Sequence, residues 1–226
     1  MKRKSVGSPR LNRPAALATD LDGTLTTGGS RLTPKLTTAL LEVKKGGTRL
    51  ILATGRCARE ALEITGADLF DAVVAEDGAV LLVDGGERRK DPPGWQRVRE
   101  QLLPHMVGGC EEVILSAGIE ELAAVRRLLP AKARIELNKD RFMVLPPGVD
   151  KGSGLLEVLS ILGLLPEDTA CLGDGENDVP MFDVVGVRVA LGNSVEALKR
   201  KADFVTAESD GEGAVEAMAR LFPGSE

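Results

Sequence analysis

The feature that most constrains the fold of this chain is a repeated alternation of short apolar runs with helical patterns. In the N-terminal part, "AALATD" is followed by a helical pattern over 34–45, "RLILAT" by one over 57–64, and "DAVVAE" closes the series. The rhythm returns near the C-terminus with "TACLGD", "GVRVAL" and "ADFVT". Such alternation is typical of strands joined by helices, so the sequence predicts an α/β fold with a mostly parallel sheet.

A different pattern separates the two alternating parts. "GAVLLVDGGERRK" predicts a hairpin that turns at residues 84–86, and the segment up to residue 147 then mixes helical and strand patterns. From Asp150 the alternation resumes with a helical pattern over 151–162. We therefore expect a parallel-sheet core made of 14–83 and 148–226, an inserted α+β cap domain at 84–147, and a flexible basic tail at 1–13.

Composition argues against several functional classes. The chain has 226 residues, a formal net charge of -5, 3% aromatic residues and no tyrosine, so it lacks the clustered cations and stacking platforms of nucleic-acid binders. No run approaches the roughly 18 apolar residues of a membrane span, and no apolar leader segment follows the basic N-terminus. We expect a cytoplasmic protein, a monomer or homodimer, with no nucleic-acid or membrane partner.

The three cysteines, Cys57, Cys110 and Cys171, are widely spaced and form no CxxC pair. This spacing predicts neither a disulfide framework nor a zinc site, so we expect unpaired thiols. The single histidine, His105, leaves a histidine-based triad or a multi-histidine metal site without its residues.

Polar residues directly follow four of the predicted strands. They are Asp20 and Asp22 after "AALAT", Thr54–Arg56 after "RLILA", Glu76–Gly78 after "DAVVA", and Gly173–Asp178 after "TACL". Ligands of open parallel sheets bind outside the carboxyl ends of the strands, so we expect these groups to share one pocket. Any one group alone is equally well explained as a strand-to-helix turn. Together they predict a carboxylate-lined site.

Carboxylates that converge in a pocket favour a hard divalent cation. Mg²⁺ takes oxygen ligands and is commonly held by one or two carboxylates together with the phosphate oxygens of a substrate. Asp20 and Asp174 are the expected direct ligands, and a bound cation relieves the repulsion between neighbouring acids. Lys151 begins a helix, where its ammonium and the helix N-terminus both face an anion. A lysine in a turn is commonly only solvated, but beside these acids Lys151 predicts a phosphate clamp.

The spacing of the first two acids has its own chemical meaning. In an extended segment the side chains of residues i and i+2 point to the same side, so Asp20 and Asp22 can both face one phosphorus atom. One carboxylate can attack while the other handles protons. Gly23 allows a sharp turn without a Cβ in the site, and the hydroxyl of Thr24 can tie that turn.

These residues resemble the four motifs of the haloacid dehalogenase-like (HAD) phosphohydrolases. The first motif is similar to Asp20–Thr24, the second to Thr54, the third to Lys151 and the fourth to Gly173–Asp178, in the family's order and over essentially the whole chain. The resemblance implies a Rossmann-like parallel-sheet core with an inserted cap of the C2 (IIB) type. Archaeal-type phosphoglycolate phosphatases and sucrose-phosphatase-like proteins belong to that branch.

The resemblance also implies a role for each matched residue. Asp20 would be the nucleophile that carries an aspartyl-phosphate, and Asp22 would be the general acid and then the base, with its backbone carbonyl on Mg²⁺. The phosphoryl group would be held by Thr54, Gly55, Lys151 and Asn177. The metal would be bound by Asp20, Asp22, Asp174 and Asp178.

The acid at position 22 favours one reaction among those of the superfamily. Members that preserve their aspartyl-phosphate lack it, so its presence predicts rapid hydrolysis and therefore a phosphatase. A sugar phosphomutase also keeps this acid and is the alternative. A non-catalytic metabolite-binding protein is a third interpretation, although such a protein would be expected to have lost Asp20, Asp22, Lys151 or Asp174.

A small cap over a polar pocket predicts a small phosphorylated metabolite as substrate, either phosphoglycolate or a sugar phosphate. Arg56 and Arg141 are candidate contacts for its carboxylate or hydroxyl groups, although a solvated turn explains Arg141 alone better. Asp77 is a further candidate substrate contact. The branch usually has an Asn-Gly-Ala turn after the third strand, whereas this chain has Asp77 at the first position. An anion there opposes a phosphorylated carboxylate unless Asp77 is paired or turned away.

Overall fold

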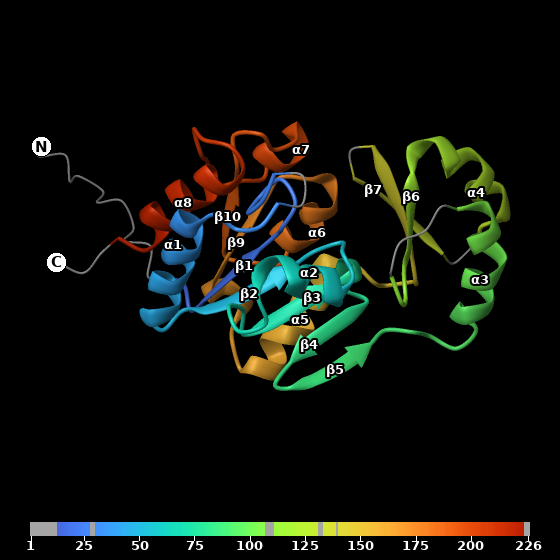
Figure 1. Cartoon of the computed structure of the whole chain (residues 1–226), viewed down its shortest axis with the longest axis horizontal. Coiled ribbons are helices and arrows are strands. Elements are labelled where there is room, and N and C mark those ends of the chain that lie inside the picture. Colours follow the sequence, from blue (N-terminus) through green and yellow to red (C-terminus); the bar gives the residue numbers. More distant parts are fainter. Residues whose placement is uncertain (1–12, 28–29, 107–110, 131–132, 139, 224–226) are drawn as a thin grey trace, which may run out of the picture.

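The computed structural model describes residues 13–27, 30–106, 111–130, 133–138 and 140–223. Two sheets organise these residues (Figure 1). The larger sheet has eight strands and the smaller has three.

The large sheet has the order β11-β10-β9-β1-β2-β3-β4-β5. All neighbours from β11 to β3 are parallel, whereas β3, β4 and β5 pair antiparallel. The predicted α/β fold with a mostly parallel sheet is confirmed. Its strands are β1 (Ala16–Thr19), β2 (Arg49–Ala53), β3 (Ala72–Ala75), β4 (Val80–Val83), β5 (Gly86–Arg89), β9 (Thr169–Gly173), β10 (Val187–Ala190) and β11 (Phe204–Val205).

Helices cover the two faces of this sheet because its central strands are apolar on both sides. In β1, Leu17 belongs to one buried cluster while Ala16 and Ala18 belong to another, as expected when alternate side chains point to opposite faces. The first cluster includes residues of α1 and α8, and the second includes residues of α5 and α6. The helices around the sheet are α1 (Pro34–Lys45), α2 (Ala58–Thr65), α5 (Lys151–Leu162), α6 (Val179–Phe182), α7 (Glu196–Lys199) and α8 (Asp210–Leu221).

Local sequence signals set the ends of these helices. Thr33 caps α1 by accepting a hydrogen bond from the Leu36 amide, with a proline as the first helical residue. Asp150 caps α5 in a reciprocal capping box with Ser153. Within the described ranges, no helix is both long and apolar enough to cross a membrane. The short 3-10 turns are η1 (Glu76–Gly78), η2 (Leu103–His105), η3 (Ile119–Glu121), η4 (Pro166–Asp168) and η5 (Glu176–Asp178).

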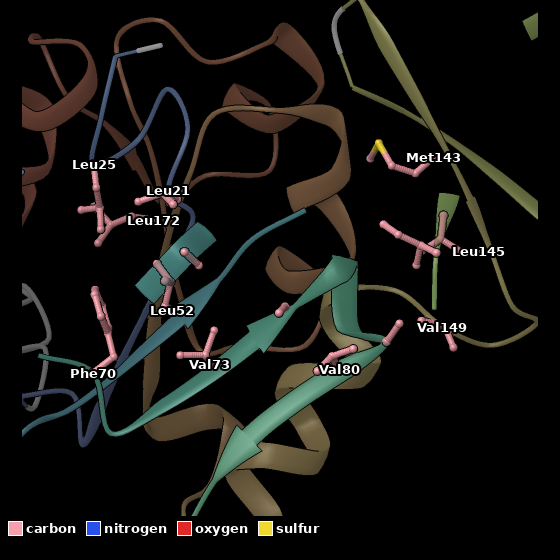
Figure 2. Packing of buried hydrophobic residues seen from close by; sticks show 14 of the residues in the cluster. Leu21, Leu25, Leu52, Phe70, Val73, Val80, Met143, Leu145, Val149 and Leu172 are labelled. Carbon is pink, nitrogen blue, oxygen red and sulfur yellow. The ribbon is translucent and has the colours of Figure 1, made fainter. Parts of the chain in front are cut away.

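The small sheet is antiparallel and has the order β6-β8-β7, formed by Leu115–Gly118, Arg141–Leu145 and Arg134–Asn138. Helices α3 (Trp95–Leu102) and α4 (Leu122–Leu128) cover the side that faces away from the large sheet (Figure 1). On its other side, Leu145 lies near Val149, and Met143, Leu145 and Val149 belong to the same buried cluster as Val80 (Figure 2). The two sheets are therefore joined by apolar packing as well as by the chain.

The predicted hairpin is present, but its second strand belongs to the large sheet. Strand β5 pairs with β4 and forms the edge of the eight-stranded sheet. The predicted cap boundary at residue 84 therefore falls inside the hairpin turn. The division into a core and a cap at 84–147 stays a prediction.

One expectation about the cysteines is wrong. Cys57, the residue before α2, is disulfide-bonded, whereas Cys171 in β9 is a buried free thiol. Spacing along the sequence gave no sign of a bond because pairing depends on distance in the fold.

Gly78→Ala should lower the free energy of unfolding more than Gly66→Ala does. Both glycines have positive φ, 97° and 85°, which costs an alanine roughly 1 kcal/mol. A Cβ at Gly78 would lie 2.1 Å from the carbonyl oxygen of Asp150, whereas one at Gly66 would meet nothing within 4 Å. The start of α5 would have to shift, at a further cost of about 1–3 kcal/mol. Urea unfolding measures the difference, and equal losses would contradict this close packing.

Candidate active site

The site is built around Asp20, which follows β1 at the carboxyl edge of the large sheet. The chain turns immediately after it, because the amides of Leu25 and Thr26 both donate to the carbonyl of Leu21. Gly23 lies in this turn with φ 88°, and a Cβ there would be 2.4 Å from Oδ2 of Asp174. A side chain at position 23 would collide with Asp174, so the turn can pass this close to Asp174 only with a glycine there. The sequence predicted a glycine turn without a Cβ in the site.

Lys151 is the cation at the centre of the site. It is the first residue of α5 and its side chain is fully buried. Its Nζ donates to Oδ1 of Asp20 at 2.6 Å and to Oδ1 of Asp178 at 2.7 Å. Burial by itself lowers the pKa of Lys151, but the charges of Asp178 and Asp20 outweigh it and raise the pKa well above its ordinary value.

Three carboxylates form a compact cluster at this edge. Asp20, Asp174 and Asp178 each offer an oxygen, and these oxygens lie within 4.8 Å of one another. Burial raises the pKa of Asp20 well above its ordinary range, with further contributions from Asp178 and Asp174, while Lys151 opposes the rise. So many buried carboxylates facing one point suit a divalent cation with oxygen ligands.

Asp178 and Asp174 are held by different partners. Oδ2 of Asp178 accepts from the amides of Asp174 and Gly175, at 2.9 and 3.0 Å, so both its oxygens are engaged. Oδ1 of Asp174 accepts from the hydroxyl of Thr24 at 3.1 Å. The predicted role of Thr24 is thus corrected: its hydroxyl reaches across to Asp174.

Asn193 is a site residue that the sequence reasoning missed. Its Nδ2 donates to the carbonyl of Gly23 at 2.7 Å and lies 3.3 Å from Oδ2 of Asp174. It follows β10, which ends at Ala190. The rule that polar residues after parallel strands gather at one edge would have found it.

The carboxylate of Asp22 is paired with an arginine. Nε and Nη2 of Arg56 donate to its two oxygens at 2.6 and 2.9 Å, and the Asp22 side chain is 37% exposed. Arg56 also contacts Glu60, one turn into α2. The pairing raises the pKa of Arg56. Arg56, expected as a substrate contact, is therefore already bound to two acids.

The predicted phosphate-binding residues Thr54 and Gly55 follow β2 at the same edge. The Thr54 hydroxyl accepts from the Arg56 amide at 3.1 Å, and its carbonyl accepts from the Asp77 amide. A Cβ at Gly55 would lie 3.3 Å from Oδ2 of Asp77. This turn therefore packs directly against the turn that follows β3.

Asp77 and Asn177 join the turns that follow β3 and β9. Asp77 is fully buried in η1, and its Oδ1 accepts from Nδ2 of Asn177 at 3.0 Å. Burial raises the pKa of Asp77, although the charge of Lys151 and the bond from Asn177 oppose this. Its Oδ2 is buried and has no hydrogen-bond partner among the described residues. Asp77 is thus turned into the site, and only one of its oxygens is paired.

Strand β7 of the small sheet brings polar side chains to the same place, which the sequence analysis did not anticipate. Nη1 of Arg134 donates to Oδ2 of Asp150 at 2.7 Å. A Cβ on Gly175 would lie 2.7 Å from Oδ1 of Asn138. Glu136 lies between them, and burial together with the charge of Asp77 raises its pKa to about 8. The signal was the period-two spacing of polar residues in "RIELN".

Arg141, the other predicted substrate contact, begins β8 and pairs in register with Asn138. It is exposed, and its Nη2 donates to the hydroxyl of Ser116 at 3.0 Å. Within the described part of the chain, no hydrogen bond or ion pair joins it to Asp20, Asp174 or Asp178. Its role in substrate binding stays a prediction.

The sequence is similar to a known family of enzymes. The family model of the haloacid dehalogenase-like hydrolases matches residues 17–90 and 114–218. A phosphoglycolate phosphatase of Methanopyrus kandleri is 30% identical over 234 residues, which cover 90% of this chain and 95% of that protein. One of Methanothermobacter thermautotrophicus is 32% identical over 222 residues, which cover 92% and 98% of the two chains.

The fold is similar to that of solved HAD proteins. A HAD subclass IIB sugar phosphatase matches with a TM-score of 0.75 at 23% identity, covering 91% of this chain and 98% of that one. This likeness concerns the fold alone, and it agrees with the predicted Rossmann-like core. The sequence relatives confirm the expected enzyme class, a phosphatase. The chain belongs to the haloacid dehalogenase-like hydrolase family.

Proposed function

We propose that this protein is a Mg²⁺-dependent phosphomonoesterase that acts on a small phosphorylated metabolite through an aspartyl-phosphate on Asp20. The observation that carries the proposal is the buried lysine that bridges Asp20 and Asp178, next to Asp174. A nucleophile, a cation for the phosphoryl group and a carboxylate set for a metal thereby meet at one point. We further propose that the protein acts in the cytoplasm, as a monomer or homodimer.

The carboxylate cluster fits a magnesium ion by its chemistry. Asp20 and Asp174 are the proposed side-chain ligands, with the backbone carbonyl of Asp22. Asp178 orients the site, because its oxygens are engaged by Lys151 and by two backbone amides. Mg²⁺ bound there supplies charge neutralisation and orients the phosphate oxygens.

Asp20 carries out the first step in this proposal. One of its carboxylate oxygens attacks phosphorus, and the bond from phosphorus to the substrate oxygen breaks, which leaves an acyl phosphate on Asp20. Lys151, already within hydrogen-bonding distance of Asp20, neutralises the phosphoryl oxygens together with the Thr54 hydroxyl, the Gly55 amide and Asn177.

Asp22 handles the protons in this proposal. Its carboxyl gives a proton to the departing alkoxide, and its carboxylate then takes one from the water that attacks the acyl phosphate. Inorganic phosphate leaves and Asp20 is restored. Arg56 donates one hydrogen bond to each oxygen of Asp22, and each oxygen keeps a second lone pair that can carry the proton.

Asp20→Asn should lower kcat for p-nitrophenyl phosphate at least about 10³-fold, because the amide oxygen is a far weaker nucleophile than a carboxylate. Asp91→Asn, at an exposed position before α3, is the matched control and should keep wild-type activity. Phosphate release with Mg²⁺ is followed in both variants. Full activity of Asp20→Asn would overturn the proposed mechanism.

Asp22→Asn should accumulate the acyl phosphate when the leaving group is activated. p-Nitrophenolate departs without a proton, so formation of the intermediate continues, whereas its hydrolysis loses a base that contributes about 10²–10⁴-fold. A burst of p-nitrophenol and a protein mass increased by one phosphoryl group are expected. Steady turnover without a burst would contradict the role given to Asp22.

Phosphorus NMR of the products from sugar phosphates would distinguish the alternative function, a phosphomutase. A mutase would form an isomeric sugar phosphate without releasing free phosphate.

Asp174→Asn should raise the Mg²⁺ concentration needed for half-maximal activity by about 10- to 100-fold, because a charged ligand is lost. Asp203→Asn is the control, since Asp203 is a half-exposed acid paired with Arg188. Mg²⁺ titrations of activity and calorimetric binding provide the measurement. An unchanged requirement in Asp174→Asn would place the metal elsewhere.

A further inference from the structure

Three buried oxygens without partners lie on the side of the site that faces the small sheet. They are Oδ2 of Asp77, Oε2 of Glu136 and Oδ1 of Asn138, and they are the buried side-chain oxygens for which the described part of the chain offers no hydrogen bond. Buried polar atoms in folded proteins are nearly always paired. A group of such atoms at one place calls for a ligand that pairs with them.

Contacts and charge interactions place these three residues close to one another. Glu136 and Asn138 are two residues apart in β7, so their side chains leave the strand on the same face. The carboxylate of Glu136 interacts with the charges of Asp77 and Lys151, and the Asn138 oxygen lies at Gly175 in the turn before η5. Asp77 meets them from the large sheet.

Three nearby side chains with donors, all in the described part of the chain, are already engaged. Arg134 donates to Asp150 at 2.7 Å, and its other terminal nitrogen lies 3.6 Å from Oε1 of Glu136. Arg56 is bound to both oxygens of Asp22, and Nδ2 of Asn177 is bound to Asp77. Among the described residues, the buried side-chain atoms without a partner here are therefore all oxygens, and all three accept hydrogen bonds once Glu136 is ionised.

We propose that Asp77, Glu136 and Asn138 form the subsite for the leaving group, and that they select phosphate esters whose leaving group carries hydroxyl donors instead of a carboxylate. Hydroxyl groups can satisfy all three acceptors. A carboxylate offers no hydrogen and would add a further negative charge beside two buried acids. The inference rests on the proposed phosphatase function and extends it to the substrate class. It runs against the substrate in the names of the curated relatives.

Two phosphate esters of similar size separate these possibilities. 2-Hydroxyethyl phosphate and phosphoglycolate differ only in a hydroxymethyl group against a carboxylate at the end remote from phosphorus. The assay is run near pH 9, because the raised pKa of Glu136, about 8, leaves its carboxyl ionised there. The groups facing Glu136 are Asp77, Arg134, Asp150 and Lys151. The measured quantity is the ratio of kcat/KM for the two esters, in which effects of pH on the shared chemistry cancel.

The wild-type protein should favour 2-hydroxyethyl phosphate by at least about tenfold. Glu136→Gln removes the charge and adds a donor, and it should lower the ratio at least about fivefold; Asn138→Ala, which removes an acceptor, should also lower it. Glu120→Gln is the control and should keep the wild-type ratio, because Glu120 is an exposed acid in η3, which follows β6 of the small sheet. Because two positions are tested, failure of one variant to fold does not prevent a decision.

A preference for phosphoglycolate, or a ratio that neither variant changes, would overturn the inference while leaving the phosphatase function in place. Arg141→Gln adds a direct rival test, since Arg141 lies on the same face of the small sheet opposite Asn138. A phosphoglycolate preference that disappears in this variant would assign the subsite to a carboxylate. No phosphate release from either ester or from p-nitrophenyl phosphate would instead overturn the proposed function, and the inference would fall with it.

Discussion

The interaction on which the rest of the site depends is the buried contact of Lys151 with Asp20 and Asp178. An ammonium that is wholly removed from water is tolerated only beside opposite charges, and two carboxylates in contact with it supply them. The three residues come from the end of β1, the start of α5 and η5. The three side chains can meet only if α5 packs against the large sheet as it does. The charge interactions of the site therefore depend on the packing of the core.

The close approach of α5 to η1 follows from this contact. Asp150 caps the helix and orients its first turn, so Lys151 leaves the helix toward the carboxyl edge of the sheet. Both elements have a glycine where they approach each other, Gly154 in α5 and Gly78 in η1. A Cβ on Gly154 would lie 2.7 Å from Cα of Gly78. Larger residues would move the helix and, with it, the ammonium. The same approach brings Asp77 of η1 next to Asn177 of η5, so one packing contact positions Lys151, Asp77 and Asn177.

The sequence predicted the parallel sheet and the placement of Asp20, Asp174 and Asp178, because strand period and the carboxyl-edge rule act locally and need no knowledge of distant contacts. Lys151 was predicted from its place at the start of a helix and from the family resemblance. What it missed depends on pairing across the chain. The bond between Arg56 and Asp22, the disulfide at Cys57, and the membership of β5 in the large sheet are decided by tertiary distances. The alternation in "RIELN" shows that one face of β7 is polar. It does not show that this face is turned toward the site at the edge of the large sheet.

The two ends of the proposed substrate site differ in character, and this polarity can orient a substrate. In the proposed function, Lys151 and the turn at Thr54 hold the phosphoryl group, whereas Asp77, Glu136 and Asn138 would accept hydrogen bonds from the leaving group. A phosphorylated polyol matches both ends in one direction only. A second anion in place of the hydroxyl groups would be drawn toward Lys151 and would compete with the phosphoryl group for it. Discrimination against such a substrate therefore begins with the direction in which it binds, before any step of the chemistry.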